Sequence, residues 1–192
     1  VYTGGISPDG VTPQGNGILM VMATPKHVLP EWWYTDGAPI ATVDMVRFIP
    51  ASKSTNYLSA VFAQLEAKKT YDAIEAIYVN KQKQVLEGTT TNIYGIKGNT
   101  IVTPEEGILH GITRSVVLKL AKDKYTIDLR PIDMDELKDF EEIFLSASNK
   151  EIVPVSKVND MVVKDGKPGP VTKDIMAMFK EYTTAFGRGD VS

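Results

Sequence analysis

The feature that most constrains the fold of this chain is a series of short apolar runs, each bounded by turn-forming residues. Runs this short are more typical of buried strands than of helices. Polar turns at residues 80–83 and 97–99 separate two pairs of runs, which predicts two hairpins. We therefore expect strands over residues 18–24, 40–49, 74–79, 84–86, 91–96, 100–103, 142–146, 151–155 and 158–163.

Four stretches between these strands are predicted to be helical, over residues 56–69, 113–122, 134–139 and 171–184. The first and the last have apolar residues at helical spacing, which predicts one buried face on each. These faces are expected to contain Leu58, Val61, Phe62, Leu65 and Ala67 in the first and Ile175, Met178, Phe179 and Tyr182 in the last. Strands outnumber helices and several are joined as hairpins. We therefore predict a mixed α/β (α+β) fold, in which peripheral helices flank a mixed sheet in one compact domain.

The remaining segments have irregular or turn-forming sequence. Residues 7–17 are rich in Pro, Gly and Asp and are predicted to form a loop. Packing against the core explains the aromatic triplet at residues 32–34 better than stacking on a ligand does. Residues 187–192 are expected to form a frayed tail. Because the chain starts at Val1 without an initiator Met, we expect a fragment of a longer protein.

The composition limits the chemistry that this fold can support. The chain of 192 residues has no cysteine, which excludes disulfides, a thiolate nucleophile and a cysteine metal site. Its two histidines, His27 and His110, argue against a histidine metal site or a Ser-His-Asp triad, so we expect no metal. The net charge of −3 arises from interspersed charges and no apolar run is as long as a membrane span. We therefore expect no nucleic-acid partner and no membrane partner.

Lys53 lies between the apolar run of residues 43–49 and the first turn of the predicted helix 56–69. The positive end of a helix disfavours an ammonium group, and a lysine that keeps some free amine can form a Schiff base. A solvated lysine is the simpler explanation when this position is considered alone.

Two other segments could bind an anion. Gly111 lets the backbone turn tightly before a predicted helix, so that the amides of Ile112 and Thr113 would point outward. Thr113 as an ordinary helix cap is the simpler alternative. The small polar residues around Ser148 either direct several amides and hydroxyls toward one anion or form an ordinary tight turn.

Glu87 follows an apolar strand and precedes Gly88 and a cluster of hydroxyls, where a carboxylate is poorly solvated. A buried carboxylate needs a cationic or hydrogen-bonding partner. A protonated ring nitrogen of a cofactor, a structural salt bridge and a turn cap are the alternatives. Together with Lys53 and the anion segments, Glu87 completes the parts of a pyridoxal-phosphate site: a phosphate cradle, a carboxylate for the pyridine nitrogen and a lysine for the aldehyde.

Three motifs occur in order along the chain: Lys53-x3-Tyr57, Glu87-Gly-x3-Asn92 and Gly111-Ile-Thr-Arg114. Together they resemble the class IV (fold type IV) pyridoxal-phosphate enzymes, which include D-amino acid aminotransferases, branched-chain aminotransferases and aminodeoxychorismate lyases. The resemblance implies the large domain of the D-amino acid aminotransferase-like fold, a pseudo-barrel mixed sheet with flanking helices. We expect residues 1–186 to form this cofactor-binding domain and the family's small N-terminal domain to be absent.

The resemblance also implies roles for individual residues. Lys53 would form the Schiff base and then move a proton, Glu87 would hold the pyridine nitrogen protonated, and Tyr57 would bind the ring oxygen. The implied cofactor-binding set is Lys53, Tyr57, Glu87, Asn92, Gly111, Ile112, Thr113, Ser148 and Asn149, and the implied substrate-binding set is Asn149 and Lys150. Residues 3–5 lack an arginine that many members place there for the substrate carboxylate, and Lys150 is hypothesised to take its role.

The implied reaction is the transfer of an amino group from an amino acid to a 2-oxo acid, with pyridoxal 5'-phosphate as cofactor. Residues 3–10 modestly resemble the D-amino acid branch, which is therefore our first expectation, and a branched-chain enzyme is the close second. A lyase on the same scaffold and an inactive cofactor-binding fragment are the alternatives. The family also implies a homodimer and a cytoplasmic location.

Overall fold

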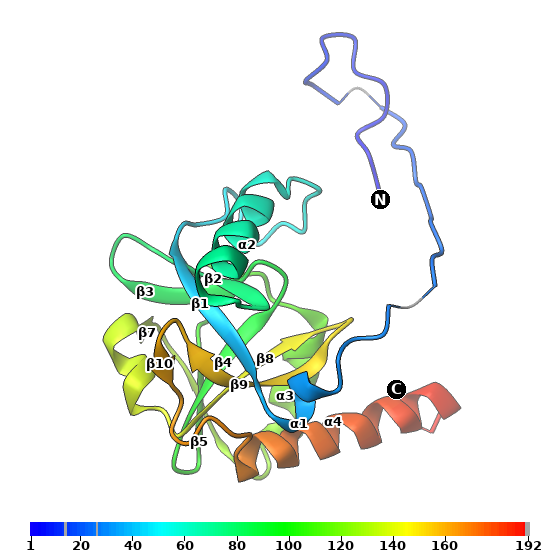
Figure 1. The fold of residues 1–192 in the computed structure, drawn as a ribbon. Coiled ribbons are helices and arrows are strands. Elements are labelled where there is room, and N and C mark those ends of the chain that lie inside the picture. Colours follow the sequence, from blue (N-terminus) through cyan, green and yellow to red (C-terminus); the bar gives the residue numbers. More distant parts are fainter. Residues whose placement is uncertain (14, 26, 191–192) are drawn as a thin grey trace.

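The computed structural model describes residues 1–13, 15–25 and 27–190. Within these residues, ten strands form one mixed sheet that is curled into a half-barrel, with helices packed around it (Figure 1). The strand order is β6-β5-β4-β8-β9-β1-β2-β3-β7, and β10 pairs with β9 beside this path. The elements are, in chain order, α1 (Trp32–Thr35), β1 (Ala38–Asp44), α2 (Leu58–Tyr71), β2 (Glu75–Val79), β3 (Gln84–Gly88), β4 (Asn92–Lys97), β5 (Thr100–Thr103), α3 (Ile112–Ala121), β6 (Thr126–Leu129), β7 (Ile132–Asp133), the 3-10 helix η1 (Met134–Asp139), β8 (Glu142–Ala147), β9 (Glu151–Val158), β10 (Met161–Val162) and α4 (Pro170–Arg188).

Two antiparallel pairs of the sheet, β2 with β3 and β4 with β5, match the predicted hairpins. The pairs β8 with β9, β4 with β8, β3 with β7 and β9 with β10 are also antiparallel. Three parallel pairs, β1 with β2, β1 with β9 and β5 with β6, make the sheet mixed. The predicted mixed fold with a pseudo-barrel sheet and flanking helices is therefore confirmed. The short strands β6 and β7 escaped prediction because half of their residues are polar and neither contains an apolar run.

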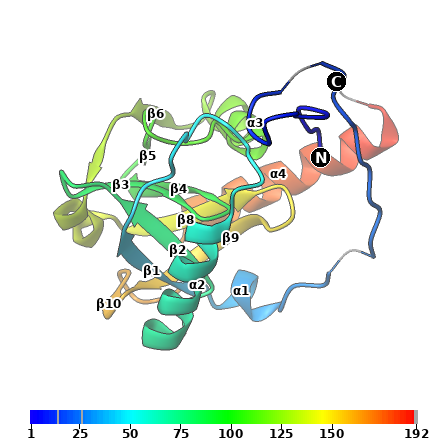
Figure 2. The same ribbon diagram turned by 90° about the horizontal axis from the view of Figure 1, so that it is seen from above.

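Helices cover the sheet from different sides (Figure 2). α3 and α4 pack over β8, and beneath them the rings of Tyr94 and Phe144 stack with their centroids 4.4 Å apart. α2 packs against β1 and β2. α1 brings Trp33 and Tyr34 onto the main core, which confirms the packing interpretation for these two residues of the aromatic triplet. The first residue of the triplet, Trp32, is exposed. The fold thus brings the ends of β3, β4 and β8 together between α2 and α3.

The buried face of α2 differs from the one that the sequence predicts. The residues that face the sheet are the small Ala60, Ala63 and Ala67, of which only Ala67 was expected. The large apolar side chains Leu58, Val61, Phe62 and Leu65 are all more than half exposed. Alanines let the helix lie close to β1 and β2, and because α2 carries apolar residues on both sides, spacing alone could not identify its inner face.

Two terminal predictions also need correction. Residues 18–24 do not form a buried strand: their side chains are exposed, and their pairing is limited to an isolated bridge between Tyr2 and Leu19, on an arm that extends away from the sheet (Figure 1). No sheet edge of the described chain lies beside this apolar run, so nothing buries it. α4 continues to Arg188, into the predicted tail 187–192, whose last two residues lie outside the described ones.

Among the described residues, no helix combines the length and the apolar character that crossing a membrane requires.

Candidate active site

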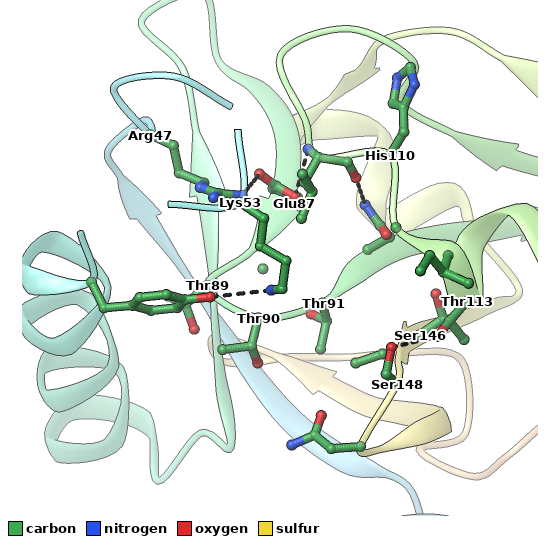
Figure 3. A pocket seen from close by; sticks show the side chains of 18 residues that line it. Arg47, Lys53, Glu87, Thr89, Thr90, Thr91, His110, Thr113, Ser146 and Ser148 are labelled. Atoms are coloured by element: carbon green, nitrogen blue, oxygen red, sulfur yellow. Dashed lines mark hydrogen bonds and ion pairs between the residues drawn. The ribbon is translucent and has the colours of Figure 1, made fainter. Parts of the chain in front are cut away.

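A cavity of about 550 Å³ opens where the ends of β3, β4 and β8 meet the start of α3 and the connection between β1 and α2 (Figure 3). All nine residues of the predicted cofactor-binding set line it. The other lining residues are Arg47, Gly88, Thr89, Thr90, Thr91, Leu109, His110, Ser146 and Ala147. The structure therefore brings the three sequence motifs together around one space.

Lys53 lies on residues 45–57, an irregular connection between β1 and α2. Its side chain is exposed, and its Nζ donates a hydrogen bond to the hydroxyl of Tyr57 over 3.3 Å. α2 begins at Leu58 with Tyr57 as its N-cap, so Lys53 precedes the helix and does not lie on its first turn. The amine is thus presented to the cavity by a loop, with a phenol beside it.

Glu87 is buried in the opposite wall and is held by two partners. Its Oε1 lies 3.1 Å from Nη1 of Arg47, and its Oε2 accepts a hydrogen bond from the amide of Leu109 over 3.0 Å. Burial raises the pKa of the Glu87 carboxyl, while the Leu109 amide, Arg47 and Lys53 act to lower it. The net result is a raised pKa, so the Glu87 carboxyl binds a proton more readily than a solvated carboxyl does.

Among the lining residues that sequence reasoning missed, Arg47 is the one that forms an ion pair with Glu87. A signal was available, because a buried carboxylate at position 87 requires a cationic partner and a salt bridge was one of the alternatives. Spacing gave no means of choosing Arg47 among the arginines and lysines of the chain. The guanidinium also donates to the carbonyl of Ser52 over 2.9 Å, so it ties the connection that carries Lys53 to the carboxylate.

The start of α3 forms a third wall. The N-terminal position leaves the amides of Ile112 and Thr113 without acceptors inside the helix, and the helix dipole adds partial positive charge there. The hydroxyl of Thr113 lies 3.4 Å from that of Ser148, which comes from the bend between β8 and β9. Amides and hydroxyls from two elements thus converge, as in anion-binding sites at helix starts.

Gly111 is required here for a reason other than the tight turn that the sequence suggests. Its φ of −63° is accessible to any residue. A Cβ at this position would lie only 2.6 Å from Oδ1 of Asn92, whose Nδ2 donates to the carbonyl of Leu109 over 2.8 Å. Glycine therefore allows the start of α3 to approach Asn92 closely, and Asn92 in turn fixes the Leu109 segment that binds Glu87.

Lys150 is the predicted site residue that does not line the cavity. Its Nζ is bonded to the carboxylate of Glu75 and, over 2.7 Å, to the hydroxyl of Thr90. Of these partners, Thr90 lines the cavity and Glu75 does not.

The donor set around the cavity matches the chemical groups of pyridoxal phosphate. The start of α3 with Thr113 and Ser148 suits a phosphate, the Glu87 carboxyl suits a protonated pyridine nitrogen, and Lys53 suits an aldehyde. In addition, the buried hydroxyl of Thr91 has no hydrogen-bond partner among the described residues. The residues therefore fit this cofactor.

Comparisons with known proteins identify the family to which the chain belongs. The family model described as amino-transferase class IV matches residues 1–158. A Methanocaldococcus jannaschii protein, provisionally named a branched-chain-amino-acid aminotransferase, is 33% identical over 97% of this chain and 67% of its own length. The D-alanine aminotransferase of Staphylococcus aureus (strain COL) is 37% identical over 85% of this chain and 58% of its own length.

Solved structures give the same result. The branched-chain aminotransferase of the archaeon Thermoproteus uzoniensis, crystallised with norvaline, superposes with a TM-score of 0.72 and 28% identity, over 79% of this chain and 53% of that one. Another branched-chain aminotransferase, crystallised with pyridoxamine 5'-phosphate, superposes with a TM-score of 0.74 and 28% identity, over 83% of this chain and 54% of that one. The chain belongs to the class IV aminotransferase family. It spans little more than half the length of the S. aureus relative and of these solved structures.

Proposed function

We propose that residues 1–186 form the cofactor-binding domain of a pyridoxal-phosphate-dependent aminotransferase. The observation that carries the proposal is the convergence of Lys53, the Glu87–Arg47 pair and the start of α3 on one cavity. When bound, pyridoxal phosphate supplies an aldehyde for amines and an electron-withdrawing ring. The reaction is the transfer of an amino group from an amino acid to a 2-oxo acid.

The residues of the cavity have different proposed roles. Lys53 binds the cofactor through Nζ and carries a proton to and from the carbon that bears the amino group, with Tyr57 orienting it. Glu87, supported by Arg47, holds a proton at the ring nitrogen. Ile112, Thr113 and Ser148 bind the phosphate, and Asn92 and Gly111 fix the segment between these two ends. Asn149 lines the same cavity and is proposed to contact both cofactor and substrate.

The proposed amino donors are D-amino acids such as D-alanine, with branched-chain amino acids second. The S. aureus relative, 37% identical, supports the first class, and the M. jannaschii relative and the T. uzoniensis structure support the second. The lyase alternative is not favoured, because these comparisons name aminotransferases. Purified protein loaded with cofactor and given one amino acid at a time would separate the classes by the 2-oxo acid released.

Titration with pyridoxal phosphate tests the cofactor proposal. We expect a visible absorbance band that borohydride fixes to the protein, and peptide mapping should locate the reduced adduct at Lys53. The Lys53→Ala variant should bind the cofactor without this adduct. The control is Lys157→Ala, because the ion pair of Lys157 with Asp160 is remote from the cavity. Lys150→Ala is not a suitable control, because Lys150 belongs to the predicted site. A borohydride-stable adduct on any other lysine would contradict the proposal.

We also propose that the protein acts as a cytoplasmic homodimer. The exposed apolar side chains of α2, Leu58, Val61, Phe62 and Leu65, support an assembly in which this surface is covered. Sedimentation equilibrium measures the mass in solution, and a monomer at all concentrations would contradict the assembly. Cell fractionation tests the location.

A further inference from the structure

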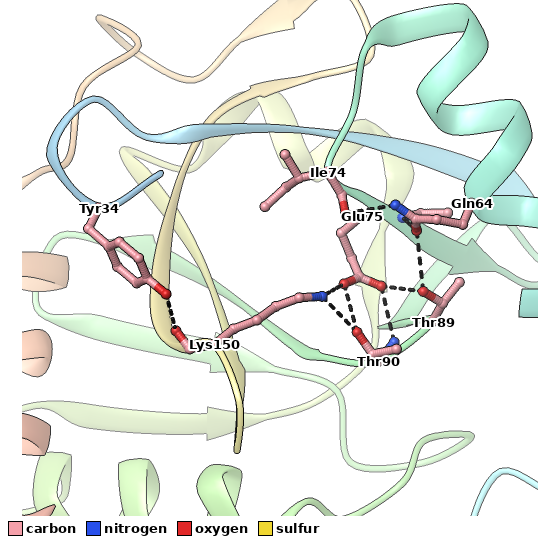
Figure 4. A network of polar contacts seen from close by, with 8 residues as sticks. Tyr34, Gln64, Ile74, Glu75, Thr89, Thr90 and Lys150 are labelled. Carbon is pink, nitrogen blue, oxygen red and sulfur yellow. Dashed lines mark hydrogen bonds and ion pairs between the residues drawn. The ribbon is translucent and has the colours of Figure 1, made fainter. Parts of the chain in front are cut away.

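A buried ion pair lies behind the cavity wall and joins two of its loops (Figure 4). Glu75, the first residue of β2, is 1% exposed, and its carboxylate is paired with Nζ of Lys150, whose side chain is 11% exposed. Neither residue lines the cavity. A charged pair that is this deeply buried has a high desolvation cost, so its contacts call for a functional explanation as well as a structural one.

On one side the pair holds the turn between β3 and β4. Glu75 Oε1 accepts hydrogen bonds from the hydroxyl of Thr89 and, over 3.0 Å, from the amide of Thr90. Glu75 Oε2 accepts a hydrogen bond from the hydroxyl of Thr90 over 2.9 Å, and the oxygen of the same hydroxyl accepts a hydrogen bond from Nζ of Lys150 over 2.7 Å. Both threonines line the cavity. The turn that follows Glu87 is therefore fixed by side-chain bonds to β2.

On the other side the pair holds the bend between β8 and β9. Lys150 closes this bend directly after Ser148 and Asn149, which line the cavity. Its backbone carbonyl accepts a hydrogen bond from the Tyr34 hydroxyl over 2.9 Å, so both its backbone and its side chain are anchored. The bond from Lys150 to the Thr90 hydroxyl thus connects the bend directly to the β3–β4 turn, and Glu75 on β2 is bonded to both residues.

We propose that Glu75 and Lys150 are positioning residues, which clamp the two loops so that Ser148 stays within reach of Thr113 at the anion-binding end of the cavity. The pair acts through the loops and does not touch the ligand. This inference rests on the proposed cofactor site. It gives Lys150 a different role from binding the substrate carboxylate, because its Nζ is already bonded to the carboxylate of Glu75 and to the hydroxyl of Thr90.

The test separates positioning from stability by comparing two variants. Lys150→Met leaves a buried carboxylate without its cation, so it should lower the urea midpoint and also weaken the binding of pyridoxal phosphate. Glu75→Gln with Lys150→Met removes both charges and should recover the urea midpoint, yet methionine cannot bond the turn. We expect the double variant to keep a dissociation constant for pyridoxal phosphate about tenfold above wild type, the factor that corresponds to the loss of roughly one hydrogen bond.

Lys157→Met is the matched control, because Lys157 lies on β9 and its ion pair with Asp160 is exposed. It should change neither the urea midpoint nor the affinity. Wild-type affinity in Lys150→Met, or recovery of affinity together with stability in the double variant, would overturn the clamp. If Lys150→Met does not fold, the double variant alone decides.

Hydrogen exchange measured without cofactor tests the clamp independently of the proposed function. The amides of residues 88–91 and 147–150 should exchange faster in the double variant than in wild type or Lys157→Met, and unchanged exchange would overturn the proposal. If wild type binds no pyridoxal phosphate, the proposed function fails, and the exchange result still judges the clamp.

Discussion

Replacing Arg47 with methionine tests how the buried carboxylate of Glu87 is tolerated. The variant keeps much of the apolar stem and removes two polar contacts, the 3.1 Å ion pair with Glu87 and the 2.9 Å hydrogen bond to the Ser52 carbonyl. The amide of Leu109 remains as a partner of the carboxylate. Because a rising pH favours the charged form of Glu87, losing the cation should lower the free energy of unfolding most at pH 8. We expect a loss of about 3 kcal/mol there, the lower end of the range observed when one member of a buried pair is removed.

We expect the loss of the free energy of unfolding in Arg47→Met to depend on pH. Burial already raises the pKa of Glu87, so the folded protein binds this proton more tightly than the unfolded chain does. The free energy of unfolding therefore falls as the pH rises through the window between the unfolded and the folded pKa. Removing Arg47, which acts to lower the pKa of Glu87, extends this window upward. At pH 5 the carboxyl can take up a proton, and only about 1 kcal/mol should remain for the lost bond to Ser52.

Urea unfolding of the cofactor-free protein at pH 5, 6.5 and 8, followed by tryptophan fluorescence and circular dichroism, measures the difference. The control is Arg47→Met with Glu87→Gln, in which a neutral amide replaces the carboxylate and the pH dependence should vanish. A loss of the same size at pH 5 and pH 8, or one that survives Glu87→Gln, would refute the reasoning.

Three other predictions concern packing, capping and assembly. Gly95→Ala should destabilise by about 2 kcal/mol, because the new Cβ would lie 2.4 Å from the buried Phe140 ring, whereas Gly187→Ala, with open space around it, should be neutral or slightly stabilising in the same urea assay. Glu142→Ala should lower the free energy of unfolding by about 2–3 kcal/mol, because the buried carboxylate accepts hydrogen bonds from the amides of Val171 and Thr172 at the start of α4. Far-ultraviolet circular dichroism and urea unfolding measure the loss, and an unchanged urea midpoint would show that water replaces the cap. Phe62→Glu should convert the proposed dimer to monomer in sedimentation while leaving the monomer folded, because this side chain is 62% exposed; a dimer of unchanged affinity would place the interface elsewhere.

Local patterns in the sequence were sufficient for the hairpins and for the three motifs of the site. β4 and β5 are joined by Gly98 and Asn99, and such a short connection leaves antiparallel pairing as the simple outcome. The local sequence around Lys53 and Glu87 was enough to indicate a candidate amine and a poorly solvated carboxylate, and both residues line the same cavity.

Long-range partners could not be predicted in the same way. Arg47 reaches Glu87 across 40 positions and Lys150 reaches Glu75 across 75, and nothing in either local sequence specifies these pairs. The inner face of α2 failed for a related reason, since β1 and β2 select alanines over larger apolar residues only once the helix is docked. Burial is a property of the assembled fold, so spacing reported the apolar content of the helix and missed its orientation.

The connection between β1 and α2 has a consequence for engineering. It carries Arg47, Lys53 and Tyr57 together, while Glu87 and Asn92 belong to strands. Loops tolerate changes of length and sequence far better than the strands that they join. The amine of Lys53, the phenol of Tyr57 and the cation of Arg47 could therefore be exchanged together as one cassette of residues 45–57. Such an exchange would change the position of the amine in the cavity while the carboxylate of Glu87 stays fixed in the sheet.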